Sequence, residues 1–382
     1  MTDERADGGE AGALPWLTQD DLPVETYRIV DPDGSYDPDA LPGLDDDEFV
    51  DLYRWMRVER RFAERMVSLQ RRGEMGTIGS GRGHEASIVG SGYGLDDGDW
   101  LLGMGREISA MFIQGVSMRD MILYWRGIED ASKYLARNNC MIGISIGGHL
   151  PLVTGIAWGM DLAGDDSVVM AHFGDGASST GAAHEGMNFA GVLDVPAVFY
   201  CQNNQWAISV PFEKQTNANT LAQRALGYGI PGIRVDGNDV LAVYRAVEEA
   251  RERARAGQPV LVESLTYRVD AHTTSDDPSA YRDEADVEPW RELDPIDRYR
   301  RFLEAEGLWS AVDDDAIVDE IDATFDAAVE EADAFAERGP DALFDYVYEE
   351  LPPGLARQLD DFDALIDENP EFHDHVEQRP KG

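Results

Sequence analysis

The chain has 382 residues, of which 43% are hydrophobic, enough to bury the core of one large domain with attached helical segments. Its 75 acidic residues far outnumber its 32 basic ones, and the formal net charge of -43 excludes the basic surface that nucleic-acid binding requires. No apolar run approaches the roughly 18 residues of a membrane span, and the N-terminus lacks the apolar core of a signal peptide, so we expect a cytoplasmic protein.

The acidic excess predicts adaptation to a salty cytoplasm. Self-repulsion of this size destabilises a compact fold in dilute buffer, but at molar salt the Debye length falls to about 3 Å and the repulsion is screened. A surface that binds basic ligands is the alternative, yet the acids are dispersed over helical faces, as in a solvated surface. Cys140 and Cys201 lie in apolar segments without ligand spacing, so we expect buried free thiols.

The first part of the chain divides into an arm and a long helix. Residues 1–44 are rich in Asp, Gly and Pro and carry isolated hydrophobic residues, so they predict an arm that lies on the core or on a partner. These hydrophobic residues are Trp16, Leu17, Tyr27 and Ile29. Residues 46–70 carry apolar residues at helical spacing, with acids at the start and Arg71 at the end, which predicts an amphipathic helix that packs on the core. After a glycine-dense stretch, a further helix is expected from the capping Ser117 to about Gly127.

The centre of the chain alternates between strands and helices. Strands are predicted at 167–173, 196–201, 233–235 and 259–269, with helices at 183–193 and 238–257 between them. This alternation predicts an α/β fold with a mostly parallel sheet, right-handed crossovers and helices on both faces. Residues 291–382 become helical and acidic. We therefore divide the chain into an arm (1–44), an α/β domain (45–300) and a C-terminal helical extension (301–382).

Polar residues follow two neighbouring strands of the predicted sheet. Asp175 lies in a Gly-Asp-Gly turn after one strand, and Asn204 follows the next. Ligands of open α/β sheets bind beyond the carboxyl ends of the strands, so these side chains should meet at one edge. Their oxygen atoms suit Mg2+, and the amides of Gly176 and Ala177 could donate to an anionic diphosphate. The tripeptide alone would be only a turn, but the helix, the strand and the second Asn at this spacing strengthen the prediction.

The segment around these residues resembles the thiamine-diphosphate signature in alpha subunits of pyruvate and branched-chain 2-oxo acid dehydrogenases. The matching stretch reads FGDGASSTGAAHEGMNFAGVLDVPAVFYCQNNQWAIS, and the resemblance continues through PFEKQT, TYRVDAHTTSDDPSAYR and RRFLEAEGLW. It spans roughly residues 45–350. The resemblance implies the thiamine-diphosphate-binding fold and an enzyme that uses thiamine diphosphate and Mg2+.

The resemblance also implies a role for each matching residue. Asp175, the side chain of Asn204 and the backbone carbonyl of Trp206 match the Mg2+ ligands. Arg106, Gly176 and Ala177 match residues that contact the diphosphate, and the backbones of Ile144 and Ile146 match positions that hold the cofactor's rings. His272 matches the loop histidine that assists acyl transfer to lipoamide. Its loop neighbours match an internal ion-pair and hydrogen-bond network, namely Asp276, Asp277, Tyr281 and Arg282.

The implied reaction is oxidative decarboxylation of a 2-oxo acid, in which the cofactor is the electron sink and the acyl group passes to a lipoyl arm. The implied partners are a beta subunit, which supplies the activating glutamate at a shared interface, and a lipoyl-bearing acyltransferase. Two alpha and two beta chains are the family's usual assembly. This chain alone should therefore be inactive.

Three departures from the family pattern affect the expected substrate pocket. Gly105 stands where Tyr is common, Gly79 stands where pyruvate-specific relatives have a His, and the segment before Ile144 lacks a His that many members carry. We expect an acyl pocket that is wider or chemically altered, with pyruvate and branched-chain acids equally consistent with it. The alternatives are an acetoin dehydrogenase alpha subunit and a non-catalytic structural or regulatory paralogue.

Overall fold

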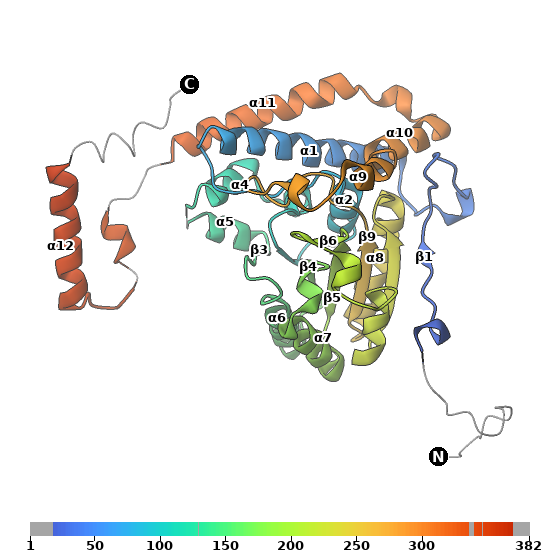
Figure 1. Ribbon diagram of the computed structural model, residues 1–382, viewed down its shortest axis with the longest axis horizontal. Coiled ribbons are helices and arrows are strands. Elements are labelled where there is room, and N and C mark those ends of the chain that lie inside the picture. Colours follow the sequence, from blue (N-terminus) through green and yellow to red (C-terminus); the bar gives the residue numbers. More distant parts are fainter. Residues whose placement is uncertain (1–17, 129, 336–339, 346, 370–382) are drawn as a thin grey trace, which may run out of the picture.

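The computed structural model describes residues 18–128, 130–335, 340–345 and 347–369. Trp16 and Leu17 of the predicted arm lie outside this range. The folded core is an α/β domain built on one large sheet (Figure 1).

Within the described part of the chain, the central sheet has seven strands in the order β1-β8-β9-β5-β4-β2-β3, and every neighbouring pair is parallel. This confirms the predicted mostly parallel sheet. In chain order, the strands are β1 (Thr26–Tyr27), β2 (Trp100–Gly103), β3 (Cys140–Ile142), β4 (Val169–Gly174), β5 (Ala197–Asn203), β8 (Gly232–Asp236) and β9 (Val260–Leu265). A separate antiparallel hairpin pairs β6 (Trp206–Ala207) with β7 (Val210–Pro211).

The strands differ from the prediction in three respects. Strands β1, β2 and β3 of the sheet were not predicted, the β6–β7 hairpin was not predicted, and β9 ends at Leu265 although the predicted strand continues to 269. The pairing of β9 with β8 ends where Asp236 lies opposite Leu265. The chain beyond Leu265 still follows β5, because the amides of Thr266 and Arg268 donate to the carbonyls of Asn203 and Asn204 at 3.0 and 3.2 Å. These contacts place Arg268 at the carboxyl edge of the sheet.

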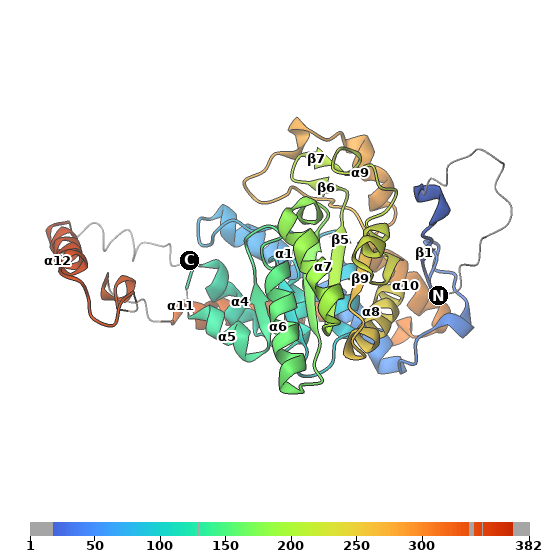
Figure 2. The ribbon, with the colours of Figure 1, turned by 90° about the horizontal axis from the view of Figure 1, so that it is seen from below.

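Helices cover both faces of the sheet, as predicted (Figures 1 and 2). One face packs on a core that includes residues of α1, α2, α8, α10 and α11, whereas the other packs on α6 and α7. The bounds are α1 (Asp46–Arg71), α2 (Glu85–Tyr93), α3 (Ile108–Ile113), α4 (Met118–Trp125), α5 (Ala131–Arg137), α6 (Leu150–Ala163), α7 (Gly181–Leu193), α8 (Val240–Arg255), α9 (Glu284–Arg291), α10 (Pro295–Glu306), α11 (Asp314–Asp333) and α12 (Pro353–Glu368).

Local sequence signals explain where the predicted helices begin. Asp45 caps α1 by accepting from the amide of Glu48 at 2.9 Å, and Glu48 accepts in return from the amide of Asp45 at 2.8 Å. This capping box satisfies amides that have no partner within the helix. Ser117 caps α4 in the same way, accepting from the amide of Asp120 at 3.1 Å. Both predicted starts are confirmed.

The two ends of the described chain attach differently. The arm adds β1 to the sheet beside β8, and Asp239 holds it by accepting from the amides of Ile29 and Val30 at 2.7 and 2.8 Å. At the other end, α11 packs along α1, whose Arg61 and Arg65 both pair with Asp322 at 2.8 Å. Helix α12 buries none of its residues and stands apart from the sheet (Figure 1).

Cys140 and Cys201 are free and buried, as expected. Within the described residues, no helix combines the length and the apolar character that crossing a bilayer requires.

A buried carboxyl group joins α1 to α3 next to the site described below. Glu59 Oε2 accepts from the amide and the hydroxyl of Ser109 at 2.7 and 2.6 Å, while its buried Oε1 has no partner. Burial raises the pKa of Glu59 to about 8. The folded protein therefore keeps a proton on Glu59 at pH values where the unfolded chain has released it.

We expect Glu59→Gln to remove a pH-dependent loss of stability. Between the ordinary pKa of 4.5 and the folded pKa of about 8, unfolding releases this proton, so wild-type stability falls by about 1.4 kcal/mol per pH unit from this group. Glutamine has no proton to release. In melting experiments on the assembled protein at constant salt, the stability of the variant relative to wild type should increase as the pH rises from about 5 to about 8. Above about pH 8 this difference should stay constant.

Glu64→Gln is the matched control, because Glu64 lies on the same helix with an exposed side chain. It should leave the pH profile unchanged. A difference between Glu59→Gln and wild type that stays constant over the whole pH range would show that Glu59 is ionised in the folded protein.

Candidate active site

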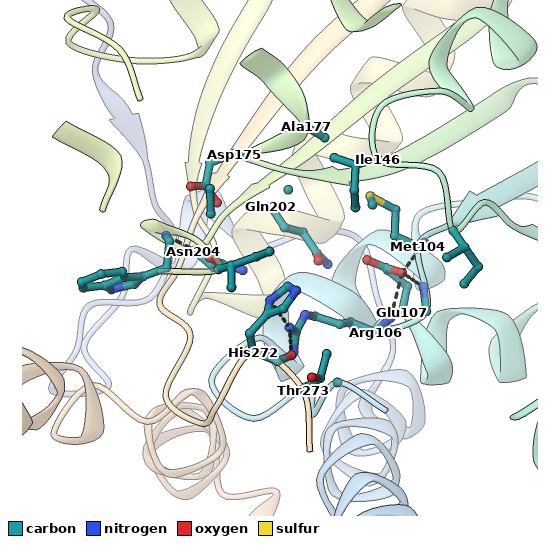
Figure 3. A pocket seen from close by; sticks show the side chains of 18 of the residues that line it. Met104, Arg106, Glu107, Ile146, Asp175, Ala177, Gln202, Asn204, His272 and Thr273 are labelled. Carbon is teal, nitrogen blue, oxygen red and sulfur yellow. Dashed lines mark hydrogen bonds between the residues drawn. The ribbon is translucent and has the colours of Figure 1, made fainter. Parts of the chain in front are cut away.

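A cavity of about 440 Å3 opens at the carboxyl ends of β4 and β5. Figure 3 shows that its side chains come from the strand ends, from the turn before α3 and from the loop that follows β9. All the residues predicted from the sequence to form the site line this one cavity, namely Arg106, Ile144, Ile146, Asp175, Gly176, Ala177, Asn204, Trp206 and His272.

The register of the sheet explains why Asp175 and Asn204 meet. Gly174, the last residue of β4, pairs with Gln202 of β5, so the residues that follow the two strands leave the sheet together. Both side chains are buried. Asn204 Oδ1 accepts from the amide of Trp206 at 3.1 Å, which folds the chain back toward the β6–β7 hairpin. The carboxylate, amide and carbonyl oxygens of these residues are a donor set of the kind that Mg2+ prefers.

The carboxylate of Asp175 fits a bound cation. It is 1% exposed, its Oδ1 has no hydrogen-bond partner, and burial raises its pKa to about 6. A buried carboxylate is costly without a compensating charge. Within the described residues, no three His, Cys, Asp or Glu side chains gather into a metal cluster. The predicted donor set has only one carboxylate, so it does not need such a cluster.

The turn after Asp175 is close to the β6–β7 hairpin. A Cβ atom at Gly176 would lie 2.7 Å from the Cβ of Ala207, so a larger residue would push the hairpin away. The helix predicted at 183–193 is confirmed as α7, which begins at Gly181, and a short 3-10 turn at Ala177–Ser179 lies between it and Asp175.

Two arginines surround His272. Arg106 donates to His272 Nδ1 at 3.1 Å and to the carbonyl of His272 (Figure 3). It also donates to the carbonyl of Ser80 at 2.6 Å. Burial, with the nearby charge of Arg268, lowers the pKa of Arg106 to about 10, so it remains cationic at neutral pH. Arg268 approaches the same Nδ1 at 3.4 Å.

These contacts define the protonation state of His272. A guanidinium group only donates, so Nδ1 must accept and the ring proton must be on Nε2. Burial, together with Arg106 and Arg268, lowers the pKa of His272 to about 4. At neutral pH the residue is therefore an uncharged imidazole whose Nε2–H can donate a hydrogen bond.

The loop around His272 contains much of the predicted network. Asp276 accepts from the amide of His272 at 2.7 Å and from the Tyr281 hydroxyl at 2.6 Å. Arg282 donates to the carbonyls of Arg268 and Val269. The predicted hydrogen bond within the network is confirmed for Asp276 and Tyr281, whereas Arg282 binds backbone carbonyls and Asp277 binds Ser279. Among the described residues, the predicted ion pairs between these side chains are not found. The contacts fix the backbone on both sides of His272.

Glu107 supports Arg106 and was missed in the sequence. Its Oε2 accepts from the amides of Met104, Gly105 and Arg106 at 2.8, 3.0 and 3.1 Å, and the side chain is buried. Three donors on one oxygen fix the turn that presents Arg106. An acid after an arginine gives no signal of this role in a chain so rich in acids.

The glycines that depart from the family pattern do not leave open space. A Cβ atom at Gly79 would lie 2.9 Å from Arg106 Cζ. At Gly105, which has a φ of +109°, it would lie 2.7 Å from Cζ2 of Trp125. The side chains of Arg106 and Trp125 therefore fill the volume that we expected to widen the pocket.

The comparisons with known proteins agree with one another. The family model of the dehydrogenase E1 component matches residues 53–341. The chain is 39% identical over 352 residues to the pyruvate dehydrogenase E1 component subunit alpha of Staphylococcus epidermidis, which covers 91% of this chain and 95% of that protein. It is 38% identical over 370 residues to the 3-methyl-2-oxobutanoate dehydrogenase subunit alpha of Mycobacterium tuberculosis, which covers 94% of this chain and 99% of that protein.

Proposed function

Because this chain belongs to the dehydrogenase E1 component family, we propose that it is the alpha subunit of a thiamine-diphosphate-dependent 2-oxo acid dehydrogenase. The observation that carries the proposal is the meeting of all the predicted cofactor and catalytic residues around one cavity. The substrate is a 2-oxo acid, either pyruvate or a branched-chain acid. The relatives are named for both, and the cavity contains no side chain that decides between them.

In this proposal, Asp175, Asn204 and the carbonyl of Trp206 hold Mg2+, and the unpartnered Oδ1 of Asp175 is the main support for that metal. Arg106, Gly176 and Ala177 would bind the diphosphate, and the backbones of Ile144 and Ile146 would hold the rings. When bound, the cofactor supplies the electron sink for decarboxylation. The chain itself supplies position and charge.

His272 would assist acyl transfer to the lipoyl group. As a neutral imidazole with its proton on Nε2, it can donate to an oxygen of the reacting acyl group. Arg106 and Arg268 disfavour the charged imidazolium, so this residue should hold and return a proton rather than carry a lasting charge. Glu107 fixes the turn that carries Arg106, and the hydrogen bonds of Asp276 fix the loop that carries His272.

An apolar face on α6 and α7 supports the proposal that a beta subunit completes the site. Five large side chains on it are 46% to 72% exposed, although they are apolar, namely Leu152, Trp158, Leu162, Phe189 and Val192. The two helices lie side by side (Figure 2), and a Cβ atom at Gly155 or Gly159 would meet nothing within 4 Å. Exposed patches of this kind mark protein interfaces.

This face leads to the cavity through the loop that carries Ile144 and Ile146, which line the cavity and are also exposed. A subunit bound here would therefore cover the cavity and could add the activating glutamate. The further partner would be a lipoyl-bearing acyltransferase. A cytoplasmic location is part of the proposal, and the two free thiols are consistent with it.

The test is decarboxylation by the chain co-expressed with its beta partner at molar salt, with an artificial electron acceptor and with thiamine diphosphate and Mg2+ present. We expect turnover of pyruvate or 2-oxo-isovalerate that is lost when the metal is chelated. Cleavage of acetoin without release of CO2 from either acid would instead identify the acetoin enzyme. A stable complex that binds the cofactor and acts on none of these compounds would identify a non-catalytic paralogue.

A further inference from the structure

We propose that Gln215 is a positioning residue for the metal site, which holds the carboxylate of Asp175 in the orientation that a cation needs. The inference rests on the proposed function, because it assigns Asp175 to Mg2+. Gln215 follows the short 3-10 turn Phe212–Lys214 and does not line the cavity. Its hydrogen bonds to the site run through Asp175 and the β6–β7 hairpin.

The contacts of Gln215 involve both parts of the proposed site. Its Nε2 donates to Asp175 Oδ2 at 2.5 Å and to the carbonyl of Val210 at 3.2 Å. Val210 is in β7, which pairs with the β6 strand that contains Trp206. One amide group therefore links the carboxylate ligand to the hairpin that carries the proposed carbonyl ligand.

This arrangement assigns different roles to the two carboxylate oxygens of Asp175. Oδ2 is bound by Gln215, whereas Oδ1 is buried and has no partner. The terminal torsion of an aspartate has broad, nearly two-fold preferences, so the side chain alone does not choose between its oxygens. The hydrogen bond from Gln215 makes this choice and leaves Oδ1 free for the metal.

The carbonyl oxygen of Gln215 gives a second observation. Its Oε1 is also buried without a partner. Mg2+ usually keeps several waters when it binds to protein, and each of them needs a hydrogen-bond acceptor. Gln215 Oε1 is therefore suited to accept from a water on the metal. Both a donor and an acceptor are needed at this position, which an amide provides and a carboxylate or an aliphatic side chain does not.

The competing interpretation is that Gln215 only stabilises the hairpin through Val210. The two interpretations predict different results for Gln215→Met, which keeps the length of the side chain but removes the donor and the acceptor. A purely structural role predicts a lower melting temperature of the cofactor-free complex, with unchanged metal affinity. A positioning role predicts weaker metal binding in a complex that is equally stable.

The experiment measures Mn2+ binding to the co-expressed alpha–beta complex at saturating thiamine diphosphate, from the electron paramagnetic resonance signal of free Mn2+. We expect Gln215→Met to raise the Mn2+ dissociation constant at least about tenfold, as loss of a hydrogen bond to a charged group would. The turnover number at saturating Mn2+ should stay within about twofold of wild type. Gln215→Asn, which keeps the amide on a side chain too short to reach Asp175, should give the same shift.

Gln223→Met is the matched control. Gln223 is a partly buried glutamine whose Oε1 also has no partner, but its Nε2 binds the N-terminal arm through the carbonyls of Gln19 and Leu22. Its replacement should leave Mn2+ affinity unchanged. A Mn2+ dissociation constant within twofold of wild type in both Gln215 variants would overturn the inference. Failure of the wild-type complex to bind Mn2+ with the cofactor would instead refute the proposed function.

Discussion

Replacing Asp175 by alanine is expected to lower decarboxylation by the assembled enzyme about 10²- to 10³-fold and to weaken Mg2+ binding by a similar factor. Asp175 is the only carboxylate in the proposed donor set, and truncating one partner of a buried charged contact costs about 2 to 5 kcal/mol. Activity measured against Mg2+ concentration at saturating thiamine diphosphate gives the size of the loss.

The same substitution should not destabilise the protein in the absence of the cofactor. Burial raises the pKa of Asp175 from 3.8 to about 6. The stability that its protonated carboxyl group contributes is therefore fully present below pH 3.8 and is lost as the pH rises through about 6. At about pH 7.5 the ionised carboxylate therefore opposes folding, and Asp175→Ala removes this cost. The melting temperature of the cofactor-free complex should be equal to or above that of wild type.

The opposite signs of these two effects separate a functional loss from a folding defect. Asp166→Ala is the control, because Asp166 is exposed and lies in the turn between α6 and β4. It should leave both activity and stability unchanged. Full activity in Asp175→Ala would exclude this carboxylate as the metal ligand.

Adding charge to the apolar face of α6 and α7 is expected to abolish activity by preventing assembly. In Leu162→Asp/Val192→Asp, two of the most exposed apolar side chains become carboxylates. At an interface, each would be buried without a partner, which costs several kcal/mol. Both positions are exposed in the free chain, so the subunit itself should fold normally.

Size-exclusion chromatography with light scattering measures the result, after co-expression with the beta partner at molar salt. The variant should elute as a free alpha chain whose circular dichroism matches that of wild type. Ala305→Asp adds the same kind of charge at an exposed position on α10 and should assemble normally. An active complex of normal mass in the double variant would show that the beta subunit binds elsewhere.

Strong periodic signals in the sequence predicted most of the fold. Helix α1 and the strands β4, β5 and β8 have clear apolar patterns bounded by caps or turns, and their predicted bounds agree closely with the structure. Strands β1, β2 and β3 were missed because segments of two, four and three residues are too short to show a period. The end of β9 was missed because it is set by the end of its pairing with β8, a tertiary contact that the apolar pattern to 269 does not reveal.

The residues of the candidate site also differ in how well the sequence predicts them. Asp175 and Asn204 could be predicted, because their positions after two strands imply a common edge of the sheet. Arg106 and His272 needed the family resemblance. Glu107 and Gln215 could not be found from the sequence, because they act through hydrogen bonds to backbone amides or to another side chain, and nothing in the sequence reveals such partners.

The pairing of β1 with β8 has a consequence for how the chain folds during synthesis. Thr26 and Tyr27 are made well before their partners Arg234 and Val235, because strands β2 to β5 lie between them in the chain. Closing so long a loop is slow, and an unpaired strand edge is prone to aggregation in the meantime. The acidic residues of the arm would keep that edge hydrated until β8 emerges, so the arm's composition protects the nascent chain before its strand completes the sheet.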